Sequence, residues 1–170
     1  VKTFNPGKHE RKDTVFTEEN TVYRFTKGIH EIDYIELPSN SILYFDRGAY
    51  VAAFADENNP RGWGNDRIIG SFKTENVKIL GRGLIDMSEI NGGHDKPKEA
   101  FLFVQCKNIL YSGLTHINSH TWTLQFYACI NAEATRLMQF SYRKYSDGIM
   151  FAECINSSAK YCFYRTGDDC

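Results

Sequence analysis

A short pattern, Cys-x-Asn, recurs in the second half of this chain and constrains the fold more than any other feature. It begins at Cys106, Cys129 and Cys154, so successive copies are 23 and 25 residues apart. Each copy follows one apolar run and precedes another, as a turn between two short strands would. A fixed period of this length is typical of a solenoid, in which each repeat forms one coil that stacks on the next.

The residue types at the repeat favour an all-β solenoid, namely a right-handed, single-stranded parallel β-helix. Asn tolerates the left-handed backbone conformation that a tight bend between two strands needs. Stacked Asn side chains can also hydrogen-bond to one another as a ladder, and a small apolar Cys suits the interior of the coil. A leucine-rich repeat has a similar period, but it needs regularly spaced Leu residues, which this chain lacks.

The repeat is visible from residue 68 onward and divides the chain into two parts. Residues 1–67 are interpreted as a strand-rich N-terminal cap with the first coil, although a β-sandwich stays open for this front part. Residues 68–170 are interpreted as the coils of the β-helix, ending at the candidate catalytic turn. Two polar segments, 56–66 and 88–99, are predicted loops, and long loops on a solenoid often rise over the binding face.

Composition excludes several classes of protein. The 170 residues carry a formal net charge of −1, whereas a nucleic-acid-binding face needs a basic excess. No apolar run approaches the ~18 residues that span a membrane. The five cysteines include no Cys-x-x-Cys pair, so neither a zinc site nor a redox pair is predicted. We therefore expect no nucleic acid, no membrane, no metal and no cofactor.

Three aspartates form the candidate catalytic cluster. Asp147 lies 21 and 22 residues before Asp168 and Asp169, which is close to one coil. On a β-helix this spacing stacks the two segments in neighbouring coils. Because three like charges so close together disfavour full ionisation, one carboxyl is expected to stay protonated. A protonated acid beside a carboxylate is what glycoside hydrolysis needs. Such clusters also bind Ca²⁺, and Ser-Asp-Gly and Gly-Asp-Asp alone are ordinary turn sequences.

Four segments, in order, resemble glycoside hydrolase family 28, the polygalacturonases. They contain a glycine-rich turn before Ile-Asp, a Ser-x-x-Trp-x-Leu stretch, a counterpart of Asn-Thr-Asp-Gly, and Gly-Asp-Asp-Cys. In this chain they are residues 76–86, 118–124, 146–149 and 167–170. The resemblance implies inverting hydrolysis of a polysaccharide such as polygalacturonate or pectin, and a secreted or periplasmic protein. It also implies that Asp168 is the general acid, while Asp147 and Asp169 activate the water.

The chain departs from this family in two ways. Tyr145 stands where the family has Asn, beside the substrate. The family also continues with Gly-His-Gly and Arg-x-Lys segments, so we expect an incomplete β-helix and the rest of the same protein after Cys170. The segment 37–51 resembles the family 49 dextranases, which are the second choice. A non-catalytic β-helix module that binds polysaccharide is the alternative function.

Three residues are predicted to contact substrate. His120 lies near Trp122, Trp63 stands in a glycine-flanked loop that suits stacking on a sugar, and Tyr145 precedes the Asp147 turn. His116 and His120 are four residues apart, which would pair them on a helix. The local pattern is a strand and then a turn, so a metal pair is not favoured.

Overall fold

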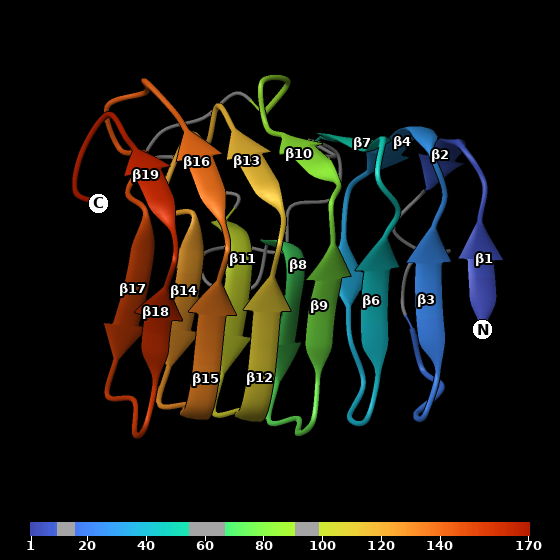
Figure 1. The fold of residues 1–170 in the computed structure, drawn as a ribbon, viewed down its shortest axis with the longest axis horizontal. Coiled ribbons are helices and arrows are strands. Elements are labelled where there is room, and N and C mark those ends of the chain that lie inside the picture. Colours follow the sequence, from blue (N-terminus) through green and yellow to red (C-terminus); the bar gives the residue numbers. More distant parts are fainter. Residues whose placement is uncertain (10–15, 55–66, 91–98) are drawn as a thin grey trace.

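The computed structural model describes residues 1–9, 16–54, 67–90 and 99–170, and these residues form nineteen short strands in three sheets (Figure 1). Sheet A contains β1 (Lys2–Phe4), β3 (Val22–Phe25), β6 (Ile42–Phe45), β9 (Lys78–Gly81), β12 (Lys107–Ser112), β15 (Ile130–Thr135) and β18 (Ser158–Lys160). Sheet B contains β2 (Gly7–His9), β4 (Gly28–Ile32), β7 (Ala49–Ala53), β10 (Leu84–Asp86), β13 (Thr115–Ile117), β16 (Met138–Phe140) and β19 (Phe163–Arg165). Sheet C contains β5 (Ile35–Glu36), β8 (Arg67–Phe72), β11 (Glu99–Val104), β14 (Leu124–Tyr127) and β17 (Ile149–Ala152).

The chain passes through sheets C, A and B in turn, and each strand pairs in parallel with its counterpart one coil away. In sheet C, for example, Phe101 pairs with Leu124, which pairs with Ile149. Parallel strands joined in this way take right-handed connections. The predicted all-β, right-handed parallel β-helix is confirmed. The described residues contain no helix long and apolar enough to cross a membrane.

The front part of the chain belongs to the same solenoid. β6 pairs in parallel with β3 on one side and with β9 on the other, and β7 pairs with β10. The sheets are therefore continuous from the front part, residues 1–67, into the part where the repeat is visible, residues 68–170. The β-sandwich left open for the front is wrong for the described residues, since their strands stack in coils instead of forming two facing antiparallel sheets.

The predicted Asn ladder lies at the corner between sheets C and A. Asn40, Asn76, Asn108 and Asn131 all have φ between 55° and 58°. The side-chain amides of the last three donate to the preceding rung at 2.9, 3.0 and 2.9 Å. Asn fits here because it adopts the left-handed conformation at little cost and its amide offers both a donor and an acceptor.

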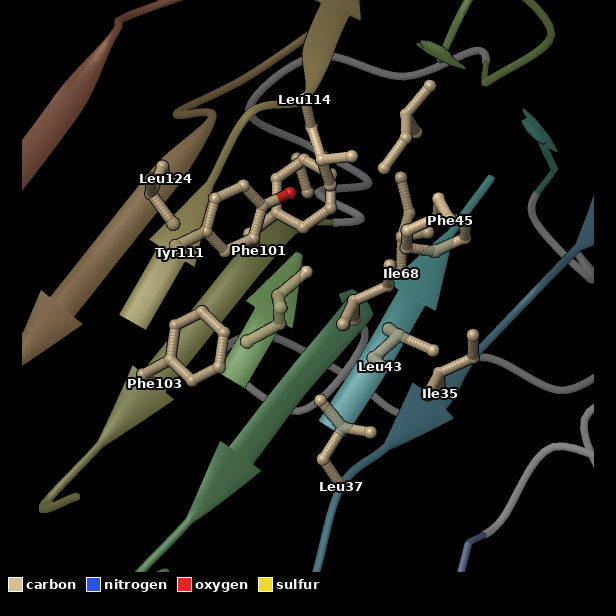
Figure 2. Close-up of a cluster of buried hydrophobic side chains, with 14 of the residues drawn as sticks. Ile35, Leu37, Leu43, Phe45, Ile68, Phe101, Phe103, Tyr111, Leu114 and Leu124 are labelled. Carbon is tan, nitrogen blue, oxygen red and sulfur yellow. The ribbon is translucent and has the colours of Figure 1, made fainter. Parts of the chain in front are cut away.

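The core fills the inside of the coil with stacked side chains (Figure 2). Phe126 stacks between Phe103 and Phe151, with ring centroids 5.3 and 5.2 Å away. Burying each such ring contributes about 1.5–3 kcal/mol. Cys106 and Cys129 are buried free thiols, as the repeat predicts.

His116 belongs to this core. Its ring is fully buried, stacks on Phe101 at 4.6 Å and shares a 2.9 Å hydrogen bond between Nε2 and the Tyr111 hydroxyl. Burial lowers the pKa of His116 to about 3, so the ring is neutral at physiological pH.

Candidate active site

The three candidate aspartates lie at the corner between sheets B and C. Asp147 is in the turn that joins β16 to β17, and Asp168 and Asp169 follow β19 in the next coil. Figure 1 shows these turns at the C-terminal end of the solenoid. The predicted loops at 56–66 and 88–99 join the same two sheets in earlier coils. Apart from residues 88–90 and the Glu99 backbone they lie outside the described residues, as does Trp63.

Backbone hydrogen bonds set the two turns side by side. The Gly148 N–H donates to the Asp169 carbonyl at 2.8 Å, and the Ile149 N–H donates to the Cys170 carbonyl at 3.1 Å. The same offset places Asp147 opposite Asp169, and strands in a ladder lie ~4.8 Å apart. Asp147 is half-buried, whereas Asp168 and Asp169 are exposed. The structure thus gathers the three predicted aspartates at one corner, and their catalytic roles stay predictions.

Ser146 links the two turns directly. Its buried hydroxyl donates to the Arg143 carbonyl at 2.7 Å and accepts a hydrogen bond from the Gly167 N–H at 3.0 Å. An added Cβ at Gly167 would lie 2.1 Å from the same Arg143 carbonyl oxygen, so only glycine permits this approach. The hydroxyl at Ser146 therefore holds the Asp168–Asp169 turn against the Asp147 turn.

Arg143 and Gln139 anchor the Asp147 turn to its surroundings. The guanidinium of Arg143 donates to the carbonyls of Ser88 and Ile90 at 2.7 and 2.6 Å, which belong to an earlier coil. The buried Gln139 amide donates to the Asp147 carbonyl at 3.1 Å. Sequence reasoning missed both residues, because nothing distinguishes an Arg in a turn or a Gln in a strand before the coil register is known.

Two of the residues predicted to contact substrate, His120 and Tyr145, lie in neighbouring coils at the corner between sheets B and C. The His120 side chain is only 3% exposed, so it lies beneath the surface of the corner. Tyr145 is half-buried, with Lys144 Nζ 5.1 Å from the centre of its ring. Trp122 is also half-buried, and the pairing of Leu124 with Ile149 puts it opposite Asp147. Contact of His120 and Tyr145 with substrate stays a prediction.

Three exposed apolar side chains lie on the outward face of sheet B near the aspartates, beside the exposed Arg165. Met138, Phe140 and Phe163 are 45%, 42% and 53% exposed, and the two phenylalanine rings lie 5.5 Å apart. β16 carries its polar Gln139 inward and its apolar neighbours outward, which reverses the usual pattern of a surface strand. Contiguous exposed apolar side chains often mark a ligand-binding groove. This face therefore forms a candidate floor beside the aspartate turns.

A second carboxylate environment lies further along sheet B, at Asp86. Its carboxylate accepts hydrogen bonds from the Tyr50 hydroxyl and from the N–H and hydroxyl of Ser88. Burial acts to raise the pKa of Asp86, but these hydrogen bonds outweigh it and hold the pKa below its usual value. The hydrogen bond to Asp86, together with burial, raises the pKa of Tyr50 to about 12. These hydrogen bonds therefore favour the ionised form of Asp86.

Among the described residues, no group of three or more His, Cys, Asp or Glu side chains is placed to hold a metal ion.

Comparison with known proteins gives a fold but no family. No protein-family model and no curated protein matches the chain. Solved structures do match, and three of them are described below. The chain shares its parallel β-helix fold with two polygalacturonases. The polygalacturonase of Erwinia carotovora ssp. carotovora aligns with a TM-score of 0.75 at 21% identity, over 89% of this chain and 50% of that one.

A hyperthermoactive exopolygalacturonase from Thermotoga maritima aligns with a TM-score of 0.77 at 20% identity, over 87% of this chain and 46% of that one. A candidate glycosyl hydrolase from Parabacteroides merdae aligns with a TM-score of 0.63 at 19% identity, over 84% of this chain and 80% of that one. The chain thus spans about half the length of the two polygalacturonases that it resembles.

Proposed function

We propose that the chain carries the carboxylate cluster of an inverting glycoside hydrolase that cleaves a polysaccharide. One observation carries the proposal: the register of the coils stacks Asp147 on Asp169, with Asp168 exposed beside them. Glycoside hydrolysis needs one proton donor and one carboxylate that activates water, and this corner offers three carboxyl groups for these two tasks.

Each carboxyl group has one task in the proposed reaction. Asp168 gives its proton to the glycosidic oxygen as the bond between that oxygen and the anomeric carbon breaks. Asp147 and Asp169 orient a water molecule and accept its proton as its oxygen attacks the anomeric carbon from the opposite side. The products are two shorter glycans, one with a new reducing end. The Asp147–Asp169 pair then releases the accepted proton to solvent, and a proton from solvent restores Asp168.

Polygalacturonate or pectin is the proposed substrate. The support comes from the sequence resemblance of four segments to family 28 and from the shared fold with two polygalacturonases. The dextranase-like alternative from the segment 37–51 predicts cleavage of a neutral glucan instead. Incubation with polygalacturonate, rhamnogalacturonan and dextran, followed by measurement of new reducing ends, distinguishes these substrates.

Replacement of the proposed acid tests the function. Asp168→Asn keeps the size of an exposed side chain but removes its proton, so hydrolysis should fall at least about 100-fold. Glu153→Gln is the matched control, since it neutralises an exposed carboxylate at the corner between sheets C and A. Near-normal turnover by Asp168→Asn would overturn the assignment, as would an equal loss in Glu153→Gln.

The exposed apolar face formed by Met138, Phe140 and Phe163 favours one second candidate, a module that binds polysaccharide without cleaving it. This candidate predicts that the wild-type protein retains polysaccharide but releases no new reducing ends.

A further inference from the structure

A second polar feature lies at another corner of the solenoid, between sheets A and B. There β9, β12 and β15 lead into β10, β13 and β16 (Figure 1). An open cleft of about 560 Å³ runs along this corner. It is lined by Arg47, Leu80, Gly81, Arg82, Ser112, Gly113, Thr115, Arg136 and Met138. The aspartate turns lie at the other edge of sheet B, so the cleft is a separate site.

The cleft is positively charged. Arg47, Arg82 and Arg136 are exposed, and no Asp or Glu is among the residues that line the cleft. In the described part of the chain none of the three arginines forms an ion pair. Their charges are therefore available to a ligand.

The nearest carboxylates in sequence are already engaged. Asp46 precedes Arg47, but it accepts two hydrogen bonds from Arg24, each 2.9 Å long. Glu133 lies 3.6 Å from the Nζ of Lys160. Within the described residues, neither carboxylate forms an ion pair with an arginine of the cleft.

Glycines keep the corner open between the arginines. Gly113 has φ of 87°, and an added Cβ there would lie 2.3 Å from the Gly81 carbonyl oxygen. At Gly81 an added Cβ would lie 2.0 Å from the Phe45 carbonyl oxygen. The Gly113 N–H donates to the Thr135 carbonyl at 3.1 Å, which places Gly113 opposite Arg136. Gly113, in the coil between those of Arg82 and Arg136, thus leaves room for a ligand group between the two arginines.

The arginines form a row along the axis of the solenoid. They precede β7, β10 and β16, and sheet B has the strand order β7, β10, β13, β16. At ~4.8 Å per strand, the backbone steps are about 5 Å and about 10 Å. A row suits an elongated ligand with repeated negative groups better than one small anion, which needs donors converging on a point. Thr115 and Met138 line the cleft and also belong to the outward face of sheet B, so the two surfaces are continuous.

We propose that Arg47, Arg82 and Arg136 bind successive carboxylates of an acidic polysaccharide lying along sheet B. Guanidinium groups bind carboxylates with two parallel hydrogen bonds, and arginine stays charged at every relevant pH. The hydroxyls of Ser112 and Thr115 line the same cleft and suit the sugar hydroxyls. The inference rests on the proposed function for the identity of the ligand, because the bound chain would be the one cleaved at the aspartates.

Binding of a short oligogalacturonate, measured by titration calorimetry in an Asp168→Asn background, tests the arginines without hydrolysis. Arg82→Gln and Arg136→Gln should each weaken binding about three- to ten-fold, since each removes a charged contact in an open site. Lys107→Gln is the matched control, because it removes one exposed positive charge at the corner between sheets C and A. It should bind like the parent.

Binding of a neutral dextran oligosaccharide should not change with either arginine substitution. Circular dichroism confirms that each variant is folded. Arg82→Lys keeps the charge but loses the paired hydrogen bonds, so it should bind between Arg82→Gln and the parent. Unchanged affinity in the Arg82→Gln Arg136→Gln double variant would overturn the proposal, and so would an equal loss in Lys107→Gln.

The two proposals fail separately. Arginine-dependent binding without hydrolysis by the wild-type protein would overturn the proposed hydrolase and leave the arginine site standing. Hydrolysis that depends on Asp168, together with binding that ignores the arginines, would overturn only the arginine site.

Discussion

Gly148→Ala should separate the two aspartate turns and so reduce hydrolysis with little loss of fold. An added Cβ would lie 2.0 Å from the Cys170 carbonyl oxygen and 2.9 Å from its carbon. Ordinary contacts of a Cβ start near 3.4 Å, so the turns must move apart by about 1 Å or more. The 2.8 Å hydrogen bond from the Gly148 N–H to the Asp169 carbonyl lies at the same point. The movement therefore displaces Asp169 relative to Asp147.

A misplacement of 1 Å in a catalytic group can cost about 100-fold in rate, and we expect a loss of that size in kcat/KM. The strain itself should cost about 1–3 kcal/mol of unfolding free energy. Reducing-end release from polygalacturonate and urea unfolding measure the two effects.

Val51→Ala supplies the control for stability. Val51 is fully buried in β7, far along the solenoid from the aspartate turns, and its truncation should cost about 1–3 kcal/mol without moving them. Activity per folded molecule should then match the wild type. Activity of Gly148→Ala within about three-fold of wild type, against the expected 100-fold loss, would refute the argument that the stacking of the two turns matters.

Three further predictions follow from single residues. The pKa of His116 is about 3 in the fold against 6.5 when unfolded, so its contribution to the free energy of unfolding should be complete above pH 6.5 and should fall by up to about 1.4 kcal/mol per pH unit as the pH drops toward 3. In urea unfolding, His116→Phe should lose this part of the pH dependence. An unchanged pH dependence in the variant would contradict the assignment. Asn108→Ala removes two ladder hydrogen bonds and places Ala at φ 55°, so it should cost about 2–3 kcal/mol, whereas Asn108→Gly should cost about 1 kcal/mol; equal losses in thermal unfolding would show that the backbone conformation is not the reason for Asn. Ser146→Ala leaves the Gly167 N–H without its acceptor, so the Asp168–Asp169 turn should be held less firmly and the rate of hydrolysis should fall about ten-fold. An unchanged rate would show that the two turns do not need this link.

The coil architecture was predictable because its signals are local and repeated. Asn108 and Asn131 occupy the bend between sheets C and A in successive coils, because Asn tolerates the left-handed backbone conformation there. This preference can be recognised in the sequence, and the spacing of the two residues gives the length of a coil. The same length places Asp147 one coil before Asp169, so the stacking of the two turns follows from counting residues.

The arginine row could not be predicted in this way. Arg47, Arg82 and Arg136 are separated by 35 and 54 residues, and the coils between them differ in length. Only the pairing of strands in sheet B shows that these residues share one corner. The inward Gln139 in β16 was equally hidden, because alternation in a strand fixes two faces but not which of them lies inside.

The order of strands in the front part was also beyond sequence reasoning. No Cys-x-Asn pattern marks β3, β4 or β6, although Asn20 and Asn40 already adopt the left-handed conformation of the later bends. Because no Cys-x-Asn pattern accompanies these two asparagines, the sequence could not distinguish a coil of the β-helix from a pair of facing sheets.

The stereochemistry of cleavage tests the proposed inverting mechanism. Inverting enzymes place their acid and base carboxyl groups about 6.5–9.5 Å apart, whereas retaining enzymes place the two carboxyl groups about 5–5.5 Å apart. Neighbouring coils are ~4.8 Å apart, which is close to the retaining separation, so the stereochemistry must be measured. Proton NMR of the first products from polygalacturonate identifies the anomer that forms before mutarotation. Inverting hydrolysis by the aspartate cluster predicts a new reducing end of inverted configuration that is not formed by Asp168→Asn. A product of retained configuration, or the same rate in that variant, would contradict it.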